Sequence, residues 1–315
     1  MDKTTNKKIN NVLHDSINQA LELIKTSITK SYEISDKNKI KGDNPVTDID
    51  IETQNLILKK IKKEFPEHGI LGEEGDTTEK VESDYLWIID PIDGTKNFIN
   101  QIPLYCVSIA VFYKGDPIMG AIGLPWDKNS IISAVKGEGI VSNFKKQRSE
   151  KTESKPSAGI LAFAPSHFTI GNIVKKKFFL NSGELRNLGS TAAELALVAN
   201  GNAQLAISGY AFTWDFAAAW ILVKESGKKI YSGDMSMNQW IENNPWKKFF
   251  NEGNYNLKEL KNWRGKFLGC DKNIAEFMIS NIKPNGRKSN NLFRKIRRFF
   301  LYQWIGNVCI GIKYR

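Results

Sequence analysis

The sequence predicts a mixed α/β fold, and three patterns carry that prediction. The first is a long amphipathic helical pattern near the N-terminus, and the second is a series of buried strands separated by turns. The third is an alternation of short strands and helices in the second half, which is typical of an α/β layer. The chain has 315 residues, of which 41% are hydrophobic and 25% charged, enough apolar mass for one large or two modest domains.

Two helices are predicted at the start of the chain. Apolar residues recur every three or four positions from Ile9 to Ile28, so residues 9–34 are expected to form one long amphipathic helix. A turn-like segment rich in Gly, Asp, Asn and Pro follows it. Residues 51–64 then predict a second helix, which ends near Pro66.

Buried strands follow the helices. The segment DYLWIID, residues 84–90, is apolar on both faces and is therefore expected to be covered on both sides. Residues 104–113 form another predicted strand, and the segments PIMGAIGL and SIISAVKG form two more with turns between them. This order of strands and turns predicts an antiparallel meander.

The second half of the chain alternates between strands and helices. The polar segment 143–156 is interpreted as the connection between the halves, an α+β half of about residues 1–150 and an α/β half of about 155–282. Helices are expected at about 170–179, 191–200 and 216–227, each preceded by a short apolar strand.

Composition narrows the class of protein. The lysine-rich N-terminus has no secretory pattern, and no apolar run approaches the ~18 residues of a membrane-spanning helix. The three cysteines lie far apart and form neither a disulfide framework nor a zinc pattern, which favours a reducing cytoplasm. The three histidines also lack the spacing of metal ligands.

Acidic residues gather at the ends of predicted elements, at Asp50, Glu73, Asp90, Asp93 and Asp215. A carboxylate at the end of a buried strand is costly unless its charge is offset. Several carboxylates that converge also repel one another, and a hard cation among them removes both costs. Magnesium, which takes oxygen ligands in an octahedron and also binds phosphate, is the expected cation.

The segment WIIDPIDGTKNF concentrates this chemistry in one turn. Asp90 and Asp93 lie three residues apart across a proline, and the carbonyl of Ile92 lies between them as a further oxygen ligand. Gly94 allows a tight turn, and Thr95 then begins a predicted helix, whose free N–H groups would hold a phosphate. The alternative interpretation is an ordinary acidic turn in which the aspartates cap a helix.

The same segments carry a resemblance to a known family. DPIDGTKNF (90–98) and WDFAAAWILVKESG (214–227) resemble the two signatures of the inositol monophosphatase-like superfamily of magnesium-dependent, lithium-sensitive phosphatases. VTDID, GILGEEG and RNLGSTAAELALVANGNAQLAI match further family segments in the same order. The resemblance runs from about residue 9 to residue 282. It implies a layered αβαβα sandwich, commonly assembled as a homodimer.

The resemblance also implies metal ligands. Glu73, Asp90 and the Ile92 carbonyl would hold a first magnesium ion, and Glu73 would bind a third, weaker ion through water. Asp90, Asp93 and Asp215 would hold a second ion. The alternative without metal binding is that Asp215 only caps the helix that follows. Glu74, next to Glu73, is interpreted as a surface residue outside the ligand set.

Catalytic and substrate-binding roles follow in the same way. Glu73, Thr95 and Asp50 are the implied catalytic residues, because Thr95 bonded to Asp50 would position and deprotonate the attacking water in two-metal hydrolysis. Asp50 has a simpler alternative role as a helix cap. The implied substrate contacts are Asp93, Gly94, Thr95, Gly189, Ser190, Thr191 and Ser208.

Two departures from the family pattern concern the substrate. Ser208 occupies a position where inositol monophosphatases carry an acid that contacts sugar-like hydroxyls, and residues 232–266 replace a short glycine-bearing hairpin. The prediction is a phosphomonoesterase for a small phosphorylated metabolite, with an inositol 1-phosphate type of substrate as first choice. The alternatives are 3′-phosphoadenosine 5′-phosphate, fructose 1,6-bisphosphate or histidinol phosphate, or a non-catalytic, membrane-associated role.

The C-terminal segment 283–315 holds most of the excess charge. It contains nine basic residues and no acid, so that of the net charge of +11 only +2 remains for residues 1–282 (+11 minus +9). Its basic cluster adjoins aromatic residues. This pattern fits either an interfacial helix on an anionic membrane, such as the inner membrane surface, or a helix and strand packed on the body or on a dimer mate. Nucleic-acid binding is the least favoured interpretation, because no recognisable RNA-binding motif is present.

Overall fold

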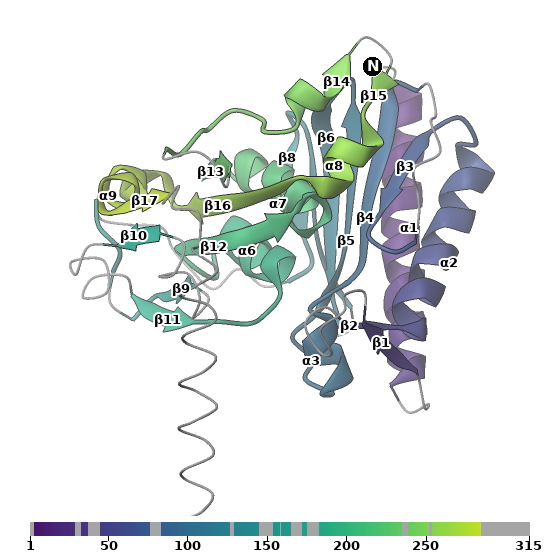
Figure 1. Ribbon diagram of the computed structural model, residues 1–315, viewed down its shortest axis with the longest axis horizontal. Helices are drawn as coiled ribbons and strands as arrows, with labels where there is room; N and C mark the ends of the chain where they lie inside the picture. Colours follow the sequence, from purple (N-terminus) through teal and green to yellow (C-terminus); the bar gives the residue numbers. More distant parts are fainter. Residues whose placement is uncertain are drawn as a thin grey trace, which may run out of the picture.

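The computed structural model describes residues 3–28, 33–36, 45–75, 83–126, 129–144, 154–157, 159–164, 172–174, 183–234, 239–251 and 254–284. These residues form five layers, in the order helix, sheet, helix, sheet, helix (Figure 1). The expected αβαβα sandwich is confirmed. No helix in this described part of the chain is long and apolar enough to cross a bilayer.

The first layer is the helix pair α1 (Lys3–Ser27) and α2 (Asp48–Glu64). The apolar positions of α1 are buried against the first sheet, as the amphipathic pattern predicts. The prediction that this helix extends to residue 34 is wrong, because the helix ends at Ser27 and Ile34 begins a strand. That strand, β1 (Ile34–Asp36), pairs with β2 (Pro45–Thr47), and a β-branched Ile suits such a pairing.

The second layer is a six-stranded sheet in the order β3-β4-β5-β6-β7-β8. Its strands are β3 (Gly69–Gly72), β4 (Tyr85–Asp93), β5 (Cys106–Tyr113), β6 (Asp116–Leu124), β7 (Ser130–Val135) and β8 (Gly139–Ser142). The strands from β4 to β8 pair antiparallel in chain order, so the predicted meander is confirmed. Only β3 runs parallel to its neighbour in this sheet.

The fourth layer is a five-stranded sheet in the order β11-β9-β12-β16-β13. Its strands are β9 (Leu161–Phe163), β11 (Glu184–Arg186), β12 (Leu205–Phe212), β13 (Lys229–Asp234) and β16 (Arg264–Cys270). Helices α6 (Thr191–Ala199) and α7 (Thr213–Glu225) lie between the two sheets, at the places predicted. Helix α9 (Ala275–Asn281), preceded by η2 (Lys272–Ile274), covers the outer face.

One predicted helix of the second half is contradicted where the chain is described. Residues 172–174, placed in a helix at about 170–179, instead form β10 (Asn172–Val174). This strand pairs antiparallel with β17 (Ile282–Pro284), and the β-branched Ile173 and Val174 favour that state. The pairing also carries the folded body to Pro284, two residues into the predicted tail. Residues 285–315, and with them the predicted membrane-binding cluster, lie outside the described residues.

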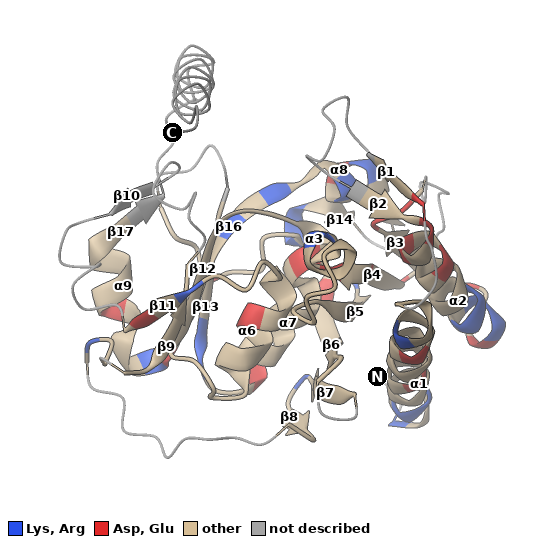
Figure 2. Ribbon diagram, turned by 90° about the horizontal axis from the view of Figure 1, so that it is seen from below, with Lys and Arg blue, Asp and Glu red and all other residues tan. Residues whose placement is uncertain are grey.

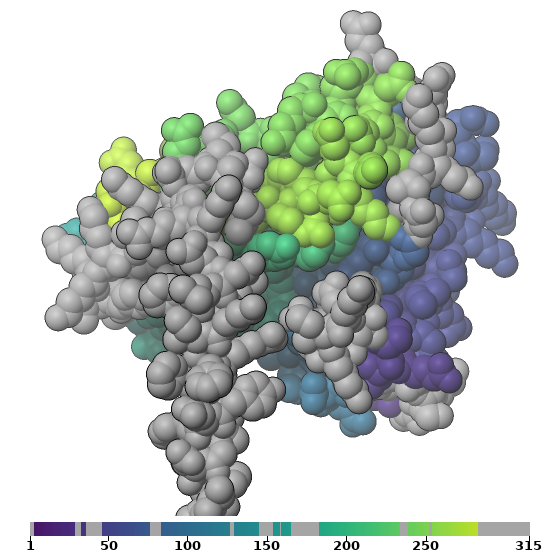
Figure 3. All heavy atoms as spheres, viewed as in Figure 1, coloured from purple at the N-terminus to yellow at the C-terminus, as the bar shows by residue number. Residues whose placement is uncertain are grey.

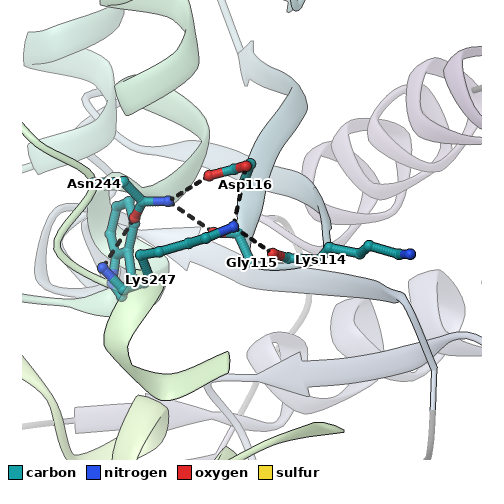
Figure 4. A network of polar contacts seen from close by, with 6 residues as sticks. Lys114, Gly115, Asp116, Asn244 and Lys247 are labelled. Carbon is teal, nitrogen blue, oxygen red and sulfur yellow. Dashed lines mark hydrogen bonds and ion pairs between the residues drawn. The ribbon is translucent and has the colours of Figure 1, made fainter. Parts of the chain in front are cut away.

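The segment 239–263, where it is described, forms part of the molecular surface, the green and yellow-green atoms in the upper part of Figure 3. It contains η1 (Lys247–Phe249), β14 (Phe250–Asn251), β15 (Asn254–Tyr255) and α8 (Leu257–Asn262). The Asn244 amide donates to the Gly115 carbonyl at 2.7 Å, and the Lys247 ammonium contacts Asp116 at 3.2 Å (Figure 4). These bonds attach the segment to the β5–β6 turn of the first sheet.

Candidate active site

The centre of the site is the turn between β4 and α3 (Thr95–Ile99). The β4–β5 register shifts between Asp90 and Asp93, so the backbone bulges where the two aspartates lie. Gly94 follows with φ = +100°, and a Cβ there would lie 3.0 Å from the Leu104 carbonyl oxygen. Glycine is therefore required by both backbone conformation and space. The tight turn that the sequence predicts is present.

Four of the predicted acids converge at this turn. Asp90 is only 1% exposed, and burial raises its pKa well above the ordinary value, with smaller increases from the charges of Glu73, Asp93 and Asp215. Burial also raises the pKa of Asp215, and Asp93 and Glu73 raise it further. Strand β4, which ends at Asp93, lies between strand β3 and helix α7 (Figure 2). The structure therefore brings together the end of β3, the end of β4 and the start of α7.

The chemistry of this cluster suits a hard cation. Oδ1 of Asp90 is buried and has no hydrogen-bond partner within the described part of the chain. Glu73 lies close enough to Asp90 to interact with it directly, and this interaction adds to the rise in the pKa of Asp90. Within the same described ranges, no three His, Cys, Asp or Glu side chains are already arranged as a metal cage. The buried oxygen atoms fit magnesium by type and charge.

Thr95 and Asp50 are in contact beside the cluster. The Thr95 hydroxyl donates its one hydrogen either to Asp50 Oδ1 at 3.2 Å or to the Ile92 carbonyl at 3.1 Å. The other oxygen of Asp50 accepts from the Thr47 backbone N–H at 2.8 Å in a capping box that starts α2. Asp50 thus both caps a helix and meets Thr95, so the two interpretations of this residue are compatible.

The segment Gly189–Ser190–Thr191 adjoins the cluster from the other half. Ser190 caps α6, and its hydroxyl donates to Asp93 Oδ2 at 2.8 Å, while the Ala192 amide donates to the same oxygen at 2.5 Å. These bonds partly offset burial, which raises the pKa of Asp93 to about 6. Ser190 therefore holds Asp93 in place, and its role as a substrate contact, like those of its two neighbours, stays a prediction. Ser208 lies in β12 and is 5% exposed.

Sequence reasoning missed two residues that hold the segment before α6 in place. The Asn97 amide donates to the carbonyls of Leu104 at 2.6 Å and Leu188 at 2.7 Å, which ties α3 to the segment before α6. Glu194 accepts from the Leu188 N–H at 2.7 Å and is 4% exposed. The detectable signals were the asparagine inside the DPIDGTKNF segment and a single acid within the apolar run TAAELALVA.

Glu194 gives a prediction about pH and stability. Burial raises its pKa from 4.5 to about 8, so between these values the folded protein binds more protons than the unfolded chain. Stability is therefore lost as the pH rises through this window. Glu194→Gln keeps a hydrogen-bond acceptor without the charge. Above pH 8 we expect this variant to unfold at a higher temperature than the wild type, with a free energy of unfolding larger by roughly 1–3 kcal/mol.

The two proteins should have similar unfolding temperatures near pH 4.5, where the Glu194 carboxyl is protonated in the folded state. The matched control is Glu184→Gln, which removes an exposed acid of β11 and should change little at either pH. An equal difference between wild type and Glu194→Gln at both pH values would show that charge burial is not the cause.

Fold and site together define an αβαβα protein with a buried carboxylate cluster between its two halves. The model of the inositol monophosphatase family matches residues 5–259. The Nus factor SuhB of Escherichia coli K12 is 32% identical over 225 residues, covering 68% of this chain and 84% of that protein. A fructose-1,6-bisphosphatase/inositol-1-monophosphatase of Aquifex aeolicus is 31% identical over 228 residues, covering 68% and 85%.

Solved structures agree in fold. SuhB of Bartonella henselae covers 87% of this chain and 98% of its own, at 23% identity and a TM-score of 0.67. An IMPase of Thermotoga maritima covers 87% and 96%, at 25% identity and a TM-score of 0.64. The chain belongs to the inositol monophosphatase family.

Proposed function

We propose that the protein is a magnesium-dependent phosphomonoesterase that acts on a small phosphorylated metabolite. The observation that carries the proposal is the convergence of Glu73, Asp90, Asp93 and Asp215 beside the Thr95–Asp50 pair. Glu73, Asp90, Asp93, Asp215 and the Ile92 carbonyl would hold two or three magnesium ions, which supply charge neutralisation and activation of water at neutral pH.

Residues of the chain would accept the proton of the attacking water and bind the phosphate. When the Thr95 hydroxyl donates its hydrogen to Asp50, the Thr95 oxygen can accept a hydrogen bond from a water O–H. Asp50 is then positioned to take up the proton that the water loses through Thr95. The backbone amides of Gly94 and Thr95 start α3, where N–H groups have no acceptor within the helix. They are the proposed phosphate donors, and Asp93, Gly189, Ser190, Thr191 and Ser208 are the proposed neighbours of the rest of the substrate.

The preferred substrate is of the inositol 1-phosphate type, and the Aquifex relative, named for fructose 1,6-bisphosphate as well, supports a sugar phosphate. We expect the purified protein with magnesium to release phosphate from one substrate of a panel far faster than from the others. The panel contains inositol 1-phosphate, fructose 1,6-bisphosphate, 3′-phosphoadenosine 5′-phosphate, histidinol phosphate and glycerol 2-phosphate. Lithium should inhibit the reaction, and omission of magnesium should abolish it.

A role without catalysis is the second candidate, because several relatives bear the name Nus factor SuhB. If no substrate of the panel releases phosphate while magnesium still binds, this candidate is favoured and the proposed activity is contradicted. Assembly as a homodimer, a cytoplasmic location and association of residues 283–315 with an anionic membrane stay predictions.

A further inference from the structure

We infer that Arg264 forms a subsite for a second anionic group of the substrate, which selects doubly anionic phosphoesters. The inference deepens the proposed function and rests on it for the position of the reacting phosphate. It begins from strand β12, where the resemblance leads one to expect an acid at position 208 and the chain has a serine. At the end of the same strand, Phe212 pairs with Arg264 of the antiparallel strand β16.

Arg264 lies directly beside the start of α7. It is the first residue of β16 and pairs in register with Phe212, the residue that caps α7. The Phe212 amide donates to Asp215 Oδ2 at 2.8 Å. Phe212 thus contacts both Arg264 and Asp215, one of the proposed metal ligands.

The guanidinium of Arg264 is held in a fixed position. Its central carbon lies 3.4 Å from the centre of the Phe212 ring, and that ring stacks on Trp214. Nη1 donates to the carbonyls of Lys261 and Trp263, both at 3.0 Å. Little rotamer freedom is left to lose when a ligand binds, which favours tight and selective binding.

The same guanidinium keeps unused donors. Two of its five N–H groups are satisfied by the bonds from Nη1, and Nε is buried without a partner among the residues that the structure describes. The edge formed by Nε and Nη2 is the one that binds a carboxylate or phosphate through two parallel bonds. A buried donor without a partner is costly, and an anionic group of the substrate would remove that cost.

A purely structural role for Arg264 predicts a different outcome. If the guanidinium only packs on Phe212 and balances the charge of the cluster, its loss should weaken the binding of all substrates to the same degree. If the guanidinium binds a second anionic group, its loss should weaken mainly the binding of substrates that carry a second anionic group. Comparison of substrates with one and two anionic groups therefore separates the two roles.

The test compares fructose 1,6-bisphosphate with glycerol 2-phosphate, in wild type, Arg264→Gln, Arg264→Lys and the control Arg186→Gln. Arg186 is an exposed arginine of β11 that pairs with Glu184 at the surface. Arg264→Gln should raise KM for fructose 1,6-bisphosphate roughly 10- to 100-fold more than it raises KM for glycerol 2-phosphate. Arg264→Lys keeps the positive charge but loses the paired N–H donors of the guanidinium. Its increase in KM for fructose 1,6-bisphosphate should therefore be intermediate.

A second readout does not depend on turnover. Binding of each phosphoester is measured by calorimetry in the presence of Ca²⁺, and the bisphosphate should bind at least about tenfold more weakly to Arg264→Gln than to wild type. If the wild type binds in this way but releases no phosphate, the proposed activity fails and the subsite stands. Equal losses for both phosphoesters, or no loss for either, would overturn the subsite.

Discussion

The Asp93→Asn variant should lose at least about 1,000-fold in kcat for the preferred phosphoester and yet unfold at a higher temperature without magnesium. The loss of activity follows because Asn is a neutral, weak ligand in a position proposed to bind a divalent ion and neighbour the phosphate. The gain in stability follows from burial, which raises the pKa of Asp93 from 3.8 to about 6.

The sign of the stability change depends on pH. Between pH 3.8 and about 6 the unfolded chain gives up the Asp93 proton before the folded protein does, so the wild type loses stability as the pH rises. The amide that replaces this carboxylate carries no charge and can still accept from the Ser190 hydroxyl. We therefore expect the unfolding temperature of the metal-free variant to exceed that of the wild type by roughly 2–4 °C at pH 7.5, with little difference near pH 4.

Asp84→Asn is the matched control for Asp93→Asn. It removes an acid from the same part of the chain, where the Asp84 carboxylate forms a surface ion pair with Lys114 at 3.5 Å. Both kcat and the unfolding temperature of this variant should stay close to those of the wild type. An Asp93→Asn enzyme with more than about a tenth of wild-type kcat would show that Asp93 holds no essential ion.

The Trp246→Ala variant should lose about 3–5 kcal/mol of stability, the usual cost of truncating a buried tryptophan. Trp246 is fully buried, and its ring lies 4.8 Å from that of Phe216 and 5.4 Å from that of Phe112. It thereby joins helix α7 to strand β5 from the segment 239–263. Thermal unfolding followed by circular dichroism measures the effect, as a fall of roughly 10 °C or more.

Trp246→Phe provides the comparison that isolates packing. The indole Nε1 is buried and has no hydrogen-bond partner within the described ranges, so its removal leaves no acceptor unpaired. We expect this variant to lose less than about 1.5 kcal/mol, because phenylalanine retains most of the apolar contact. A Trp246→Ala loss below about 1 kcal/mol would show that segment 239–263 is not part of the core.

The elements with a strong local pattern could be predicted from the sequence. The meander and the helices α2, α6 and α7 follow from apolar periodicity and turns, and the tight turn at Gly94 follows from its neighbours. Where pairing partners are distant, the prediction failed. Ile173 was placed in a helix, and its strand state depends on residue 283, more than a hundred positions away.

The site shows the same division between local and distant information. The convergence of Asp90 and Asp93 lies within one turn, so that part could be read directly from the sequence. The bonds from Asn97 to Leu188 and the stacking of Arg264 on Phe212 join positions 91 and 52 residues apart. No local pattern encodes such contacts, because the pairing of β12 with β16 and the docking of α3 on the α6 segment create them.

The most direct test of the central claim is calorimetric titration of the metal-free protein with Mg²⁺ at pH 7.5 in two buffers of different ionisation heat. The account predicts saturable binding by the wild type and by Asp84→Asn, and its loss in Asp93→Asn and Asp215→Asn. Because carboxyl groups with raised pKa give up protons when a cation enters, the heat should differ between the buffers. Equal Mg²⁺ binding by all four proteins would contradict the assignment of the metal site to this cluster.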